Sequence, residues 1–218
     1  MQLGISLMSN SIDQIYDEFK GDNNELIKST LDTIRQRPLS MQIATDSDDR
    51  KKLALEAAKQ LKDQSGPRVA VFELDGFDTH AAQGGVEGAH ADELEEVNEI
   101  VKILYENLGQ AFDNTLILTL TEFGRTIKQN GGYGTEHGYG SAILMAGGLL
   151  KKSQVYTDWP GLKKKELFEG RDLNSTIDSR AVYNSAMSMC FDKDTEFLRR
   201  EVFWGDDLPD LTEELFKI

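Results

Sequence analysis

A strand–helix–strand pattern between residues 68 and 121 places the strongest constraint on the fold of this chain. Residues 68–74 form a short apolar run after the turn Ser65-Gly66-Pro67, as expected of a buried strand. A long amphipathic helix is predicted over 89–112, and a second strand over 115–121. Strands joined by such a helix are expected to lie parallel, with a right-handed crossover. The pattern therefore predicts an α/β fold with a mostly parallel sheet and helices on both faces.

The remaining periodicity divides the chain into a helical N-terminal segment, residues 1–67, packed on an α/β domain, residues 68–218. Apolar residues at helical spacing predict two short helices over 12–37 and a third over 48–64. Further helices are predicted over 178–190 and 194–203, and further strands over 141–146 and 154–157.

Charge and cysteine content exclude several classes of function. The net charge is −14, from 24 Lys and Arg against 38 Asp and Glu. Such a surface repels nucleic acid and anionic membranes, whereas a small anionic substrate would need a local positive centre. The single cysteine excludes an internal disulfide and a thiolate metal cluster. We see no signal peptide and no transmembrane span, so the localisation is left open.

Three polar motifs stand beside the ends of the predicted strands, where open α/β sheets bind their ligands. They are Gly76-Phe77-Asp78-Thr79-His80, Glu122-Phe123-Gly124-Arg125-Thr126 and Gly134-Thr135-Glu136-His137-Gly138. Two of the three histidines of the chain lie in these motifs. The third, His90, has no polar pattern around it and is expected at the surface.

The chemistry of these motifs indicates a divalent metal site. In an extended segment Asp78 and His80 project to the same side. His137, with a carboxylate from Glu122 or Glu136, would complete a nitrogen and oxygen ligand set. Two imidazoles with carboxylates suit zinc best, and also manganese or iron, better than calcium. The predicted ligands are Asp78, His80, Glu122 and His137.

Each motif also has a purely structural interpretation. Asp and Thr in a glycine-rich loop often only build turns, and a loop histidine is often only solvated. Glu122, at the end of an apolar strand, needs either a metal or a partner, and Arg125 is the nearest partner in sequence. In the polar run 171–180, a structural role is favoured for Arg171, Asp172, Asp178 and Arg180.

Five ordered strings resemble one bacterial family, the domain of unknown function fifteen-oh-one, which includes sulfatase-like and twin-arginine-signal proteins. The strings are GFDTHAAQ, LTEFGRT, GTEHGYGSAILMAGG, VYTDWPGL and RDLNSTIDSRAVY, within residues 68–191. The resemblance implies an alkaline-phosphatase-like fold in the phosphatase and sulfatase superfamily, usually exported. It also implies that Asp78 with His80, and later His137, are metal ligands. Glu122-Phe123 stands where the superfamily has a second Asp-His pair, and Phe cannot bind a metal.

The resemblance covers the C-terminal half of that fold. The family's Gly-Asn-Asp-Gly-type strand end, and the nucleophile from the same half in the superfamily, have no counterpart before Phe72. We therefore expect the N-terminal part of the fold to be missing. The sheet so exposed is expected to be covered by a second copy or by a partner chain.

Two functional interpretations follow. The first is a metal-dependent hydrolase module for phosphate or sulfate esters, incomplete as this chain, with Arg125 as a possible contact for the anion. The second is a binding or structural module with a degenerate metal site. The sequence identifies no nucleophile.

Overall fold

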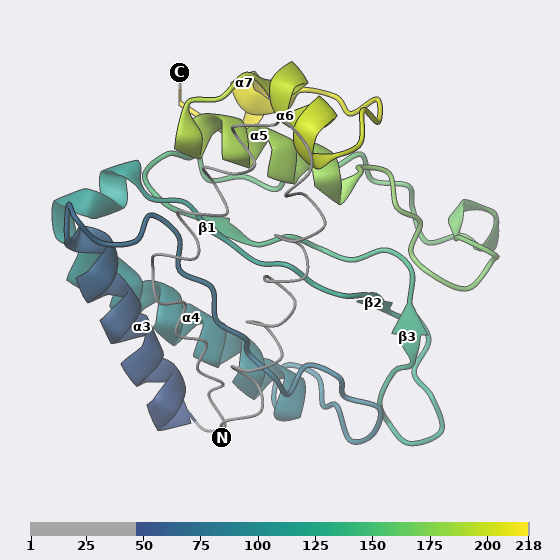
Figure 1. The fold of residues 1–218 in the computed structure, drawn as a ribbon. Coiled ribbons are helices and arrows are strands. Elements are labelled where there is room, and N and C mark those ends of the chain that lie inside the picture. The colour runs from purple at the N-terminus through teal and green to yellow at the C-terminus, as the bar shows by residue number, and fades with distance from the viewer. Residues whose placement is uncertain (1–46, 218) are drawn as a thin grey trace, which may run out of the picture. The chain divides into compact units, whose positions relative to one another are not determined.

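The computed structural model describes residues 47–217, which divide into two compact units after Leu74. The first unit contains helix α3 (Ser47–Lys62), which confirms the helix predicted over 48–64. The two helices predicted over 12–37 lie outside the described residues. The second unit begins at Asp75 and contains all of the other helices and strands described here (Figure 1).

An antiparallel ribbon of two chain segments runs through the second unit (Figure 1). Strand β1 (Ile117–Leu118) pairs with β4 (Met145–Ala146), and β2 (Gly124–Arg125) pairs with β3 (His137–Gly138). The first pair encloses the second in sequence, so the ribbon is one extended hairpin. Between the two pairs the returning segment contains one residue more than the outgoing segment. This extra residue shifts the register as a β-bulge does.

The predicted parallel sheet, with its alkaline-phosphatase-like arrangement, is wrong. Within residues 47–217 both two-stranded sheets are antiparallel, and most of the regular secondary structure is helical. Residues 68–74 and 154–157 form no strand. The physical reason lies in the connection. The segment 115–121 pairs with the next apolar segment, 141–146, through a hairpin, which antiparallel pairing allows and parallel pairing does not.

The long predicted helix is confirmed as α4 (Ala89–Leu108), followed by the 3-10 helix η1 (Gly109–Asn114). The C-cap residue of α4 is Gly109, whose φ of 56° suits a residue without a side chain. Ile100, Leu104 and Leu108 are buried. Because α4 is not followed by a parallel strand, it does not act as the predicted crossover.

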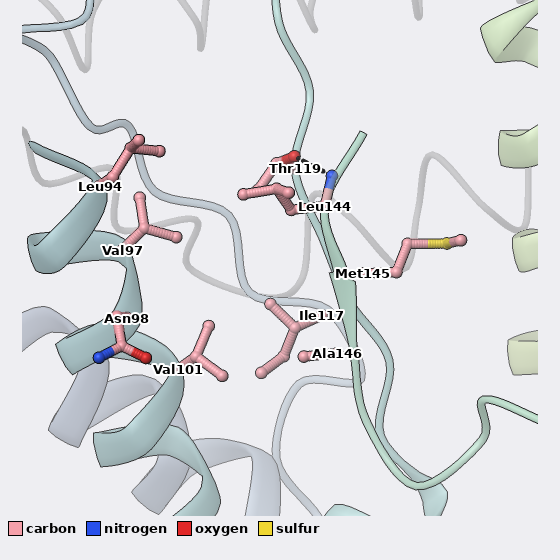
Figure 2. Close-up of a pocket in the computed structure, with 9 residues that line it drawn as sticks. All are labelled: Leu94, Val97, Asn98, Val101, Ile117, Thr119, Leu144, Met145 and Ala146. Atoms are coloured by element: carbon pink, nitrogen blue, oxygen red, sulfur yellow. Dashed lines mark hydrogen bonds between the residues drawn. The ribbon is translucent and has the colours of Figure 1, made fainter. Parts of the chain in front are cut away.

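The two faces of the ribbon have different neighbours. Leu118 and Met145, which are cross-strand partners, pack against a hydrophobic cluster formed by buried residues between Ala181 and Phe216. Ile117 and Ala146, the adjacent pair, line a hollow beside α4 (Figure 2). This alternation follows from the two-residue period of side chains along a strand.

The C-terminal cluster contains α5 (Ser179–Phe191), α6 (Thr195–Val202) and α7 (Thr212–Leu215). The first two confirm the helices predicted over 178–190 and 194–203. The buried residues of the cluster are Ala181, Val182, Ala186, Phe203, Leu208, Leu211, Leu215 and Phe216. The buried Ser185 hydroxyl accepts a 2.8 Å hydrogen bond from the Leu211 backbone N–H, which fastens the last segment to α5. None of the helices within residues 47–217 has the length and apolar character needed to cross a bilayer.

The start of α5 provides a first testable prediction. Asp178 is its N-cap residue and accepts a 2.9 Å hydrogen bond from the Arg180 backbone N–H. Arg180 also pairs with Asp178 and with Asp206, in line with the structural role expected for this run. We expect Asp178→Ala to lower the free energy of unfolding by about 1 kcal/mol, measured by urea denaturation at pH 7. Asp158→Ala, in an exposed loop, should have little effect.

The same pair has a predictable pH dependence. Side-chain hydrogen bonds from Arg180 lower the pKa of Asp178 below its ordinary 3.8, although partial burial opposes them. A carboxyl with a lowered pKa stabilises the fold above its ordinary pKa and loses this effect as the pH falls through the folded value. The difference between wild type and Asp178→Ala should therefore shrink as the pH is lowered below 3.8. A difference that grows with acidification would contradict this assignment.

Candidate metal centre

The first and third motifs meet because their loops are joined by backbone hydrogen bonds. Residues 79–83 run antiparallel to 132–135, through an isolated bridge between Ala81 and Tyr133. The Ala82 N–H donates to Gly132 at 2.9 Å, and the Thr135 N–H donates to Thr79 at 3.2 Å. Main-chain bonds therefore place His80 beside the strand that carries His137.

Gly134 makes this close approach possible. A Cβ built at this position would collide with the backbone of Thr79 and His80. By contrast, a Cβ at Gly131 in the same loop would meet no atom within 4 Å. Steric contact thus requires a glycine at position 134 but not at position 131.

Asp78, His80 and His137 form a compact group of potential metal ligands. Their ligand atoms all lie within 4.8 Å of one another. The two Nε2 atoms of His80 and His137 are 3.1 Å apart, and each lies 3.0–3.1 Å from one Asp78 oxygen. Ligands bonded to a tetrahedral zinc at 2.0–2.1 Å are about 3.3 Å from one another. The three side chains therefore already have nearly the separations that such an ion requires.

Glu136 orients the His80 imidazole. Its Oε2 lies 3.0 Å from Nδ1 of His80, so an N–H at Nδ1 leaves the Nε2 lone pair directed at the group. Asn130 holds Glu136 in turn, donating from Nδ2 to Oε1 at 2.6 Å. The Asn130 Oδ1 also accepts from the backbone N–H of Gly132 at 2.9 Å and of Gly134 at 3.0 Å. Asn130 thus links the shape of the loop to the orientation of the imidazole.

Phe123 orients the second imidazole. Its ring stacks on that of His137, with centroids 3.8 Å apart and an interplanar angle of 19°. Phe123 is the residue that cannot bind a metal in the second motif, and here it supports the candidate ligand His137 from the side. Neither this contact nor the role of Asn130 was predicted from the sequence, although an Asn just before two glycines is a known turn signal.

Arg125 faces His137 across the ribbon, since the two are register partners. Its guanidinium forms an ion pair with Asp78, and its Nε donates to the Thr135 hydroxyl at 3.0 Å. The charged partner of Arg125 is therefore Asp78 rather than Glu122, its neighbour in sequence. Arg125 adds positive charge at the edge of the group and holds the Asp78 carboxylate in place.

The carboxylates of the centre are stabilised in their charged form. Desolvation raises the pKa of Asp78, but hydrogen bonds with His137 and Arg125 outweigh it, so the pKa lies below its ordinary value. The hydrogen bond from Asn130 lowers the pKa of Glu136, and contact with His80 lowers it further against the opposing effect of desolvation. Both groups are therefore anionic at neutral pH, as a ligand and its supporting acceptor need to be.

The structure brings together three of the four predicted ligands. Glu122 is exposed and lies outside the group of Asp78, His80 and His137, whereas Glu136 contacts His80. Of the two carboxylates that the sequence left open, Glu136 is thus the one beside the group. His90, expected at the surface, is half-buried, with its ring edge-on to Phe77 at 5.9 Å between centroids.

Residues 34–198 match the model of a family described as Protein of unknown function (DUF1501). The match spans all three motifs and the structured loops around them. No curated protein matches the chain, and no solved structure matches it.

Proposed function

Since the chain belongs to the DUF1501 family of proteins of unknown function, we propose from the geometry of its residues that Asp78, His80 and His137 bind a divalent metal ion. Zinc suits this ligand set best, and manganese or iron are the alternatives. We further propose that the chain is a metal-dependent hydrolase module for phosphate or sulfate esters.

The observation that carries the proposal is the convergence of both Nε2 atoms on one Asp78 oxygen, at 3.0–3.1 Å. The contact between His80 and Glu136 is the arrangement typical of metal-binding histidines. Two neutral imidazoles and one carboxylate match the ligands of zinc enzymes that keep one coordination position for water or substrate.

Exposure of the group supports a catalytic rather than a purely structural site. The side chains of His80, Asp78 and His137 are 44%, 53% and 50% exposed. Structural zinc sites normally have four protein ligands, so three exposed ligands leave room for a substrate. When bound, zinc supplies Lewis acidity to an ester oxygen and activates a water molecule. The residues of this chain would bind the ion, orient both imidazoles and keep Asp78 ionised.

One observation favours the alternative, a metal-binding module without catalysis. The guanidinium of Arg125 is already engaged by Asp78 and Thr135. An anionic ester would have to displace one of these partners to gain the contact. Measured hydrolysis separates the two functions, because metal binding is common to both.

Zinc titration by calorimetry tests the proposal, with two matched carboxylate variants. We expect wild type to bind one zinc ion, and Asp78→Asn to weaken this binding at least about tenfold, as loss of an anionic ligand requires. Glu122→Gln removes the same charge outside the group and should bind zinc as wild type does. Absence of zinc binding by wild type would refute the metal site, and an effect of Glu122→Gln as large as that of Asp78→Asn would refute this ligand set.

The hydrolase part of the proposal needs a separate assay. Zinc-loaded wild type and Asp78→Asn are incubated with aryl phosphate and aryl sulfate esters, and release of the phenol is followed. Turnover by wild type that Asp78→Asn abolishes would support the hydrolase. If both proteins release phenol only at the background rate, although zinc is bound to wild type, the chain is a metal-binding module without catalysis.

A further inference from the structure

A basic, exposed loop contrasts with the acidic character of the chain. The loop, residues 151–165, has one acidic residue, Asp158, and five lysines: Lys151, Lys152, Lys163, Lys164 and Lys165. Residues 151–159 and 162–165 are exposed. Within the described part of the chain, Lys152 and Lys163–Lys165 take part in no ion pair. The loop therefore offers unneutralised positive charge on a protein of net charge −14.

The same loop presents large apolar side chains to solvent. Val155 is 88% exposed, Trp159 is 60% exposed and Leu162 is 54% exposed. Apart from the 3-10 turn η2 (Lys164–Glu166) at its end, the loop has no regular structure. Long irregular loops in compact domains are usually functional segments or flexible linkers, and several large apolar side chains exposed on one loop favour an interaction site. Basic and apolar groups together indicate a partner surface that is both acidic and apolar.

A groove with that chemistry lies on the second unit itself. It has a volume of about 250 Å³ and is lined from α4 by Leu94, Val97 and Val101, which Figure 2 shows pointing toward the ribbon. The ribbon contributes Ile117 and Leu144 to the opposite wall. Small-molecule sites usually measure about 300–1,000 Å³. The groove is smaller than that and suits one or two apolar side chains.

Helix α4, which forms one wall of the groove, is acidic. Helix α4 has one lysine, Lys102, and six acidic residues: Asp92, Glu93, Glu95, Glu96, Glu99 and Glu106. Asn98 lines the groove and donates from Nδ2 to Glu95 at 3.3 Å, which places a carboxylate at the edge. The groove thus has a mostly apolar lining and a carboxylate, Glu95, beside it on an acidic helix, which complements the basic and apolar loop.

We propose that the basic loop of one copy docks in the groove of a second copy of this chain. Trp159 and its apolar neighbours enter the groove, and Lys163–Lys165 face the carboxylates of α4. Charge complementarity selects a second copy over an anionic membrane, because the rest of the chain carries the opposite charge and repels such a surface. Loop and groove are different patches, so two copies can exchange the contact reciprocally, or copies can join head-to-tail in a closed ring or an open filament.

Charge reversal tests this contact by analytical ultracentrifugation over a range of protein and salt concentrations. We expect wild type to self-associate, more strongly at low salt. Lys163→Glu, Lys164→Glu and Lys165→Glu together should weaken association at least about tenfold, since like charges then face each other. A control with the same change in net charge, Lys59→Glu, Lys62→Glu and Lys193→Glu, should associate as wild type does.

Complementation identifies the partner surface. A Glu95→Lys, Glu99→Lys variant should also lose self-association, but it should form mixed complexes with the Lys163–Lys165 triple variant. Trp159→Ser, at an exposed position, should weaken association with an unchanged circular dichroism spectrum. A wild type that stays monomeric, or a triple variant that associates normally, would overturn the proposal. Lysine-dependent binding of wild type to phosphatidylserine vesicles without self-association would overturn it in favour of a membrane.

Discussion

Replacing His80 and His137 together by alanine is expected to reduce zinc affinity by at least about a thousandfold, since protein zinc sites derive roughly 10–16 kcal/mol from a few ligands. The two imidazoles supply both nitrogens of the group, and Asp78 alone would be left to bind the ion. Binding is measured by calorimetry against a chelator of known affinity. Any ester hydrolysis by the wild type should fall to background in the same variant.

The third histidine supplies the control for this experiment. His90 lies outside the group, so His90→Gln should leave the zinc affinity unchanged. Circular dichroism of each variant shows whether the fold survives the substitution. Zinc binding by the double variant at nearly wild-type affinity would show that the ion is held elsewhere.

Gly134→Ala is expected to disable the proposed metal centre without removing any of its three candidate ligands. A Cβ at this position collides with the backbone of Thr79 and His80, so the loop that carries Asp78 and His80 must move away from the ribbon. A shift of about 1 Å in a preorganised site can cost a hundredfold in function, and we expect zinc affinity to fall by about that factor. Calorimetry measures the loss.

The matched control is Gly131→Ala in the same loop, where a Cβ meets no atom within 4 Å. This variant should bind zinc as wild type does. If the two alanine variants behave alike, the contact between the loops is not what positions the imidazoles. If Gly134→Ala alone weakens binding, backbone proximity at this position controls the site.

Helices α3, α4, α5 and α6 were predictable from the sequence, because apolar stripes such as the one that includes Leu104 and Leu108 define a helix face over many residues. The prediction of a strand over 68–74 was wrong because a short apolar run has no periodicity that distinguishes a buried strand from irregular chain. Whether such a run forms a strand depends on pairing with segments distant in sequence. The hairpin of 117–125 with 137–146 was missed for the same reason. The local sequence of a strand does not determine whether that strand pairs with the preceding or with the following segment of the chain.

The candidate ligands were largely predictable, because chemistry restricts them: the chain has only three histidines. The choice between Glu122 and Glu136 was not predictable. Each lies in one of the three polar motifs, directly before an aromatic or imidazole ring. Only the contact between residues 79–83 and 132–135 shows which carboxylate lies beside His80. The stacking of Phe123 on His137 likewise depends on register within the ribbon, which pattern analysis does not fix.

The main-chain bonds between residues 79–83 and 132–135 have a consequence for how this site can vary. Backbone amides and carbonyls are present whatever the side chain, so the frame that brings Asp78, His80 and His137 together does not depend on the identity of these three residues. The side chains at these three positions can therefore be changed without changing the main-chain geometry of the loops. Cysteine or glutamate at these positions would offer other metals a different donor set on an unchanged frame. If zinc binding is measured as proposed, the centre is a suitable starting point for selecting a new metal preference by substitution at these three positions.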